Sequence, residues 1–262
     1  MSTAVDPNLN PVIVAGAGGG GASLPATPAA ALLDVASPST FVVLDPAGVG
    51  TSISAADARA ALGARVAVPD TGWTDVIAGT ASVTHTGGVQ TLNVDSGGGG
   101  VLSHRASLAS PECPALELIG RLDVTTGTPG TAWWSGLSLG SAADNYGYIA
   151  QVADAGAVQL WQAHSSGYSL VGSAGSVSLT SGDTYIRLVV TPSYAAASYG
   201  TGSGSTAPTS WTVAASVAIT TATLAASRLD RVGLRAGRTA SGSGTYTAEW
   251  RNVQARILGL SP

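Results

Sequence analysis

The chain has 262 residues, with 11 arginines, no lysine and 15 acidic residues, which give a formal net charge of −4. Only 10% of the residues are charged and 45% are hydrophobic, which excludes a solvated coiled coil and the highly charged kind of disorder. The first 58 residues account for the whole net charge, through Asp6, Asp34, Asp45 and Asp57. No basic stripe is present to neutralise a phosphate backbone, so we expect no nucleic-acid partner.

The sequence also bears on disulfides, membrane spans and secretion. The single cysteine, Cys113, excludes an intramolecular disulfide. No apolar run approaches the roughly 20 residues that cross a bilayer. The N-terminal sequence also lacks the positive segment and apolar run of a secretory signal. We therefore expect neither membrane insertion nor a secretory signal.

Residues 1–36 are predicted to form an extended arm. The run Val12–Ala15 favours a strand, and the glycine tract after it has no stable conformation of its own. Pro25 and Pro28 oppose a regular helix in the following residues. Such a segment buries too little apolar surface to offset the entropy lost on ordering. We therefore predict that it is an assembly arm held by partner chains.

Residues 37–72 are predicted to form a connector. Thr40–Asp45 favours a strand that ends before a proline. Ser54 and Asp57 have the spacing of a capping box, and a glycine follows the last turn. These signals predict a short helix over residues 54–62.

The segment Thr51–Gly63, TSISAADARAALG, carries a resemblance. It is similar to a short helix that recurs in bacteriophage tail-fibre and minor tail proteins, between a virion-proximal segment and a distal domain. An ordinary alanine-rich capped helix is the alternative. The resemblance implies a virion protein made in the host cytoplasm, a homotrimer by preference, attached to other virion proteins through residues 1–36.

Residues 73–262 are predicted to form one all-β domain, an antiparallel β-sandwich. Runs of alternating apolar and polar residues are separated by short Gly, Ser, Asp and Thr turns. The clearest hairpins join Tyr146–Val152, Val158–Gln162 and Tyr168–Val171, with a glycine at the end of each turn for a positive φ. We expect strands at residues 81–85, 90–95, 100–107, 115–124, 132–139, 146–152, 157–163, 168–174, 184–191, 211–218, 231–236 and 246–258.

The pattern of these strands resembles the concanavalin A-like lectin/glucanase jelly roll, the fold of laminin G-like modules. The resemblance is carried by Leu116–Val124, Trp133–Gly136, Gly182–Val190 and the closing run Ala248–Val253. Such a fold hosts lectins, glycosidases and inert structural modules, so it does not by itself assign a function.

The spacing of the acidic residues does not favour a glycosidase active site. Retaining glucanases of this fold place carboxylates at alternate positions of one strand, about 5 Å apart. Glu112, Glu117 and Glu249 do not have that spacing, and the three histidines lack a nucleophile-elbow context. No histidine or cysteine pair and no calcium loop defines a metal site. We expect no enzyme, no cofactor and no metal, and calcium held by turn aspartates is the alternative that the resemblance implies.

The aromatic residues are the remaining candidates for a binding site. Flat Trp and Tyr rings stack on a pyranose, while Asn and Asp bind its hydroxyls. Adjacent tryptophans in a strand point to opposite faces, so at least one can lie off the core. We predict a glycan site from such groups, with core packing as the alternative for each aromatic. Its members are Trp133, Trp134, Asp144, Asn145, Tyr146, Tyr148 and Trp161.

We make predictions for two further segments. Tyr194–Pro208, rich in Gly, Ser and Ala, is predicted to be a long polar loop that makes binding or lattice contacts. Four arginines between residues 228 and 238 are expected to form ion pairs with Asp230 and nearby acids.

Two classes of function remain open. The first is a non-enzymatic phage structural protein, a minor tail or tail-fibre component, with a capsid decoration or head-fibre protein as its nearest variant. The second is a stand-alone carbohydrate-binding module. We favour the first, with adsorption to a host cell-surface glycan as an additional expectation that joins the two.

Overall fold

The computed structural model describes part of the chain in full and part as backbone only. Full description covers residues 65, 67–94, 115–125, 133–140, 147–153, 156–164, 167–179, 181–191, 193–219, 229, 231–238, 245–256 and 258. The backbone alone is described for residues 12–15, 40–44, 50–54, 66, 100–106, 126 and 257. None of these residues forms a helix long and apolar enough to cross a membrane.

The chain divides into two compact units, residues 1–66 with 259–262 and residues 67–258. In the first unit, β1 (Val12–Ala15), β2 (Thr40–Leu44) and β3 (Gly50–Ser54) form a three-stranded antiparallel sheet in that order. The strand of the expected arm therefore pairs with the strand of the expected connector. Ser54 ends β3, and the rest of the predicted helix over residues 54–62 lies outside the described residues.

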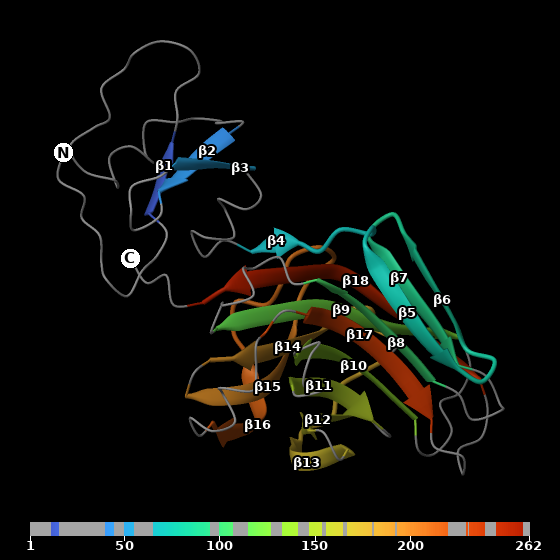
Figure 1. The fold of residues 1–262 in the computed structure, drawn as a ribbon. Coiled ribbons are helices and arrows are strands. Elements are labelled where there is room, and N and C mark those ends of the chain that lie inside the picture. The colour runs from blue at the N-terminus through green and yellow to red at the C-terminus, as the bar shows by residue number, and fades with distance from the viewer. Residues whose placement is uncertain are drawn as a thin grey trace. The chain divides into compact units, whose positions relative to one another are not determined.

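The second unit is an antiparallel β-sandwich, which confirms the predicted fold class (Figure 1). Its two sheets are called the front sheet and the back sheet. The front sheet has the order β13 (Gly167–Ala174), β12 (Ala157–His164), β11 (Gly147–Ala153), β10 (Trp133–Gly140), β17 (Arg231–Arg238), β8 (Gly100–Ala106), β5 (Trp73–Ala78). The back sheet has the order β16 (Thr212–Ala218), β15 (Tyr194–Thr201), β14 (Thr184–Val190), β9 (Leu116–Thr126), β18 (Tyr246–Ile257), β7 (Val89–Val94), β6 (Ser82–Thr86). The two-residue β4 (Val66–Ala67) pairs with β18 off this path.

The chain changes sheet repeatedly, as in a jelly roll. It passes from back to front between β9 and β10, returns between β13 and β14, and crosses again before and after β17. Strands far apart in sequence thus become neighbours, such as β10 beside β17 and β9 beside β18. Closure of this kind is characteristic of double-sheet folds with Greek-key connections.

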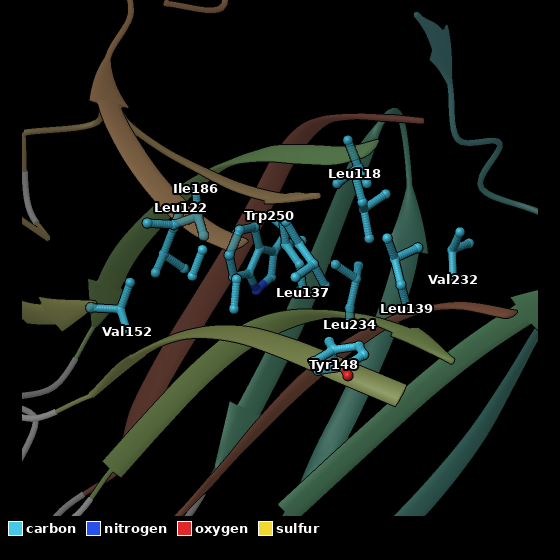
Figure 2. Packing of buried hydrophobic residues seen from close by; sticks show 14 of the residues in the cluster. Leu118, Leu122, Leu137, Leu139, Tyr148, Val152, Ile186, Val232, Leu234 and Trp250 are labelled. Atoms are coloured by element: carbon cyan, nitrogen blue, oxygen red, sulfur yellow. The ribbon is translucent and has the colours of Figure 1, made fainter. Parts of the chain in front are cut away.

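The hydrophobic core lies between the two sheets and is centred on Trp250 (Figure 2). Alternate residues of the facing strands, among them Leu118, Leu137 and Ile186, are completely buried there. The Trp250 indole donates from Nε1 to the Ser135 hydroxyl at 2.9 Å, which satisfies the one polar atom of the largest core side chain.

Strands β15 and β5 differ from the sequence predictions. Tyr194–Thr201 is strand β15 rather than part of a polar loop, and only residues 202–211 connect it to β16. Its small side chains fit because Ala195 and Ala197 face the core while Ala196 and Ser198 are buried on the opposite side. The edge strand β5 was not predicted, since its sequence WTDVIA does not alternate cleanly.

The edges of the two sheets meet at β5 and β6. The His85 ring of β6 stacks on the Trp73 ring of β5, with centroids 4.8 Å apart and planes 4° from parallel. His85 Nε2 also lies 3.1 Å from the Asp75 carboxylate of β5. Side chains thus join two edge strands that each have one backbone partner among the described strands, β8 for β5 and β7 for β6.

Candidate functional site

The outer face of the front sheet gathers aromatic, amide and guanidinium groups from five strands. These side chains alternate with core residues, so they point away from the back sheet. We call this surface the aromatic face. Its members are Trp134, Gln151, Gln159, Trp161, Tyr168 and Arg235.

Trp134 is positioned by its neighbours in β10 and β17. The preceding residue, Trp133, points into the core, and strand alternation turns Trp134 outward. Gly237 lies opposite Trp134 in β17, and a Cβ atom there would overlap the indole ring. The glycine therefore lets the ring lie flat against the neighbouring backbone.

The hydroxyl of Tyr246 supports the same point from the core side. It lies 2.6 Å from the Trp134 carbonyl oxygen, and it accepts a hydrogen bond from the Gly237 amide at 2.9 Å. Burial raises the pKa of Tyr246, so the phenol stays protonated and can donate. A residue of the back sheet thus fixes the backbone on which Trp134 stands.

Two amides and an indole form a hydrogen-bonded row across β11 and β12. Gln159 Oε1 accepts from Gln151 Nε2 at 3.0 Å and from Trp161 Nε1 at 2.8 Å. Because the Gln159 carbonyl oxygen accepts two hydrogen bonds, the amide group is held in one orientation. Gln159 Nε2 and Gln151 Oε1 have no partner within the described part of the chain, which leaves one donor group and one acceptor for a ligand.

Arg235 lies between two aromatic rings. Its guanidinium carbon is 4.7 Å from the Trp134 ring centroid and 4.7 Å from the Tyr168 ring centroid. Burial lowers the pKa of Arg235, an effect partly opposed by Tyr168. No carboxylate of the described residues pairs with it, and its Nε has no hydrogen-bond partner. Asp230, the partner expected for the arginine cluster, lies outside the described residues.

The contact between Arg235 and Tyr168 shows how the front sheet is shaped. β10, β11 and β12 lie between β17 and β13. A flat sheet would separate the two outer strands by about 19 Å, four steps of about 4.8 Å. The two side chains meet only because the sheet curves toward this face, which brings its aromatic groups together.

The outer face of the back sheet contains arginines of a different kind. Glu117 of β9 is 1% exposed, and its carboxylate accepts from Arg187 Nε at 2.7 Å and from Arg256 Nη2 at 3.0 Å. The Arg187 guanidinium carbon also lies 5.4 Å from the Trp211 ring centroid. On this face, the Glu117 carboxylate pairs with both the Arg187 and the Arg256 guanidinium.

The predicted glycan-site residues lie in different parts of the structure. Trp134 and Trp161 both lie on the aromatic face, and their role in binding stays a prediction. Trp133 and Tyr148 are 2% and 3% exposed, so their prediction as ligand contacts is wrong, because strand alternation directs both into the core. Asp144, Asn145 and Tyr146 lie outside the described residues.

Four members of the aromatic face are not among the predicted glycan-site residues. Tyr168 lies across from Ala163 in the β12–β13 hairpin, a register that places it on the Trp161 side. Gln151 and Gln159 are directly paired between β11 and β12. These hairpin pairings could have been found from the turn positions, whereas the place of Arg235 depends on the order of distant strands. Within the described part, no group of three or more His, Cys, Asp or Glu side chains could hold a metal ion.

The fold defines the class of this protein as a two-sheet β-sandwich of the jelly-roll type. No protein-family model and no curated protein matches the sequence. Among solved structures, a carbohydrate-binding module from Bacillus subtilis is similar over 71% of this chain and 96% of its own, with 14% identity and a TM-score of 0.46.

Two other solved structures are similar in the same way. A functionally unknown protein from Saccharomyces cerevisiae has 12% identity and a TM-score of 0.48, over 73% of this chain and 100% of its own. A GH43B protein of a xyloglucan locus from Bacteroides ovatus has 12% identity and a TM-score of 0.48, over 74% of this chain and 38% of its own.

Proposed function

We propose that this chain is a non-enzymatic carbohydrate-binding protein and that the aromatic face is its glycan site. The observation that carries the proposal is the gathering of Trp134, Trp161 and Tyr168 on one curved sheet face. A pyranose has apolar C–H faces that stack on such rings and a rim of hydroxyls that need donors and acceptors. The Gln159 donor and the Gln151 acceptor supply these beside the rings.

The placement of the carboxylates supports binding rather than hydrolysis. Glycoside hydrolysis requires two carboxyl groups that flank the scissile bond. Glu117 and Glu249 lie on the back sheet, where arginines bind them. Among the described residues the aromatic face has no carboxylate, so its groups are suited to holding a sugar without cleaving it.

A glycan array probed with the full chain tests this proposal. We expect retention of defined glycans, and a loss of affinity of about 5- to 30-fold in Trp134→Ala, since stacking anchors contribute on the order of 1–2 kcal/mol. Trp211→Ala is the matched control, because Trp211 is a half-buried tryptophan that directly precedes β16 and contacts Arg187 of the back sheet. Equal losses in both variants, or no glycan bound by the wild type, would contradict the proposal.

We further propose that the glycan-binding unit belongs to a bacteriophage virion protein of the minor tail or tail-fibre type. The support is the sequence, namely the glycine-rich arm and the segment Thr51–Gly63. A capsid decoration protein is the nearest alternative. We expect a homotrimer by sedimentation, and loss of incorporation into particles when residues 1–36 are deleted. Full incorporation of the deleted protein would overturn the role of the arm.

A further inference from the structure

Arg235 is the one member of the aromatic face that carries a formal charge. It remains protonated at neutral pH, because a guanidinium does not lose its proton in proteins. The side chain is partly buried, between Trp134 and Tyr168. Burial of a charge without an opposite charge is unfavourable. The aromatic rings offset only part of that cost, since a cation–π contact contributes about 0.5–2 kcal/mol.

The two ring contacts and a side-chain hydrogen bond with Tyr168 do not use every N–H donor of the Arg235 guanidinium. Both rings approach the guanidinium carbon at 4.7 Å. The N–H donors of arginine lie in the guanidinium plane and form a fork that matches a carboxylate. Nε of Arg235 is buried and has no hydrogen-bond partner among the described residues. Its donor capacity is therefore not used up by the protein.

The back sheet shows what this chain does with an arginine that has a structural role. Arg187 contacts the Trp211 ring, as Arg235 contacts Trp134, but Arg187 also donates to the buried Glu117. Arg256 donates to the same carboxylate. The protein itself provides the anion on that side, whereas Arg235 has aromatic contacts and no anion among the residues that the structure describes.

We infer that the aromatic face selects acidic glycans and that Arg235 binds the carboxylate of a hexuronate residue in the bound sugar. The inference rests on the proposed glycan-binding function. A hexuronate combines the three features that the face can recognise. Its ring C–H groups stack on the aromatic side chains, its hydroxyls meet the Gln159 and Gln151 amides, and its carboxylate pairs with the guanidinium.

The test compares acidic and neutral forms of one sugar. Oligogalacturonate and its methyl ester are titrated into the full chain, with tryptophan fluorescence as the readout. We expect the acid to bind about 10- to 100-fold more tightly than the ester, since hydrogen bonds to charged groups contribute about 1.5–3 kcal/mol. The preference should shrink as sodium chloride is added, because salt screens the charge pair.

Three variants assign the preference to one residue. Arg235→Met keeps a long apolar side chain between the rings and should bind acid and ester equally. Arg235→Lys keeps the charge without the planar fork and should retain part of the preference. Arg231→Met is the matched control, because Arg231 lies on the same face of β17, four residues away, and should leave the preference intact. Circular dichroism and thermal melting check that each variant is folded.

The outcomes separate this inference from the proposed function. Equal affinity of the wild type for acid and ester, with neutral glycans still lost in Trp134→Ala, would overturn the acidic preference and leave glycan binding in place. A preference that persists in Arg235→Met would overturn the role of Arg235. If neither galacturonate form nor any glycan of the array binds the wild type, both the inference and the proposed function are contradicted.

Discussion

The outer faces of the two sheets use the same residue types for different ends. On the back sheet, Arg187 and Arg256 both form ion pairs with the buried Glu117, so the protein itself supplies the opposite charge. On the front sheet, Arg235 lies between two aromatic rings with no carboxylate among the described residues. The comparison teaches that ion pairing, rather than the presence of arginine and tryptophan, distinguishes a structural face from a candidate binding face.

The comparison is tested most strongly at Glu117. We expect Glu117→Gln to lower the free energy of unfolding by about 3 kcal/mol, because it leaves two arginines without their anion. The lower end of the usual range applies, since the Arg187 and Arg256 side chains are 24% and 31% exposed. Urea unfolding measures the change. A loss below about 1 kcal/mol would show that this face is not held by its ion pairs.

The connection between the two sheets is tested by Tyr246→Phe. We expect a loss of about 2 kcal/mol in urea unfolding, because the Trp134 carbonyl and the Gly237 amide lose a buried partner. Glycan affinity should fall as well, since Trp134 stands on this backbone. Thr247→Ala, at the next position of β18, is the control that should leave glycan affinity unchanged. An unaltered affinity in Tyr246→Phe would mean that the aromatic face does not depend on the back sheet.

The same hydroxyl predicts a response to alkali. Burial raises the pKa of Tyr246 above its ordinary value of 10.0, so the unfolded chain loses the phenol proton at a lower pH than the folded one. The stability that this group contributes is therefore complete below pH 10 and falls as the pH rises beyond it. Burial also raises the pKa of Tyr148, so the decline in Tyr246→Phe should become shallower without vanishing. Identical slopes in the two proteins would contradict this account.

A smaller effect is expected when the position of Trp134 is disturbed. Gly237→Ala places a methyl group where the indole ring lies. We expect a loss of about 1 kcal/mol from overpacking, accompanied by weaker glycan binding because the ring must turn. Ser138→Ala, on the same face of β10, should change neither quantity. Unaltered binding in Gly237→Ala would show that the orientation of Trp134 is not important.

The smallest change in stability is expected at Arg235. Arg235→Met should alter the free energy of unfolding by less than about 1 kcal/mol, because the lost ring contacts are offset by removal of a buried charge without an anion. Urea unfolding of this variant beside Glu117→Gln contrasts the two faces directly. A loss as large as that of Glu117→Gln would mean that Arg235 has a structural partner after all.

The sequence predicted the features that depend on neighbouring residues. Alternation placed Trp133 and Trp134 on opposite sides of one strand, and the glycine turns placed β11, β12 and β13 in consecutive hairpins. Gly156 and Gly167 have the positive φ values expected of them, +83° and +138°. Local signals of this kind are sufficient to set register within a hairpin.

Features that depend on the order of distant strands could not be predicted. Arg235 meets Tyr168 only because β17 inserts beside β10 and the front sheet curves. The strand β15 was missed because its buried residues are mainly alanines, which have the composition of a loop in a chain this rich in small residues. In both cases the deciding contacts lie outside any local window of sequence.

The stacked pair at the joined sheet edges has a consequence for self-association. β5 exposes Val76 and Ile77, with 55% and 47% of their surfaces open to solvent. An apolar edge strand of this kind can template pairing with another copy and lead to aggregation. The Trp73–His85 stack and the contact between His85 and the Asp75 carboxylate link this strand to β6. We expect this link between the two edge strands to hinder pairing of β5 with another copy of the chain.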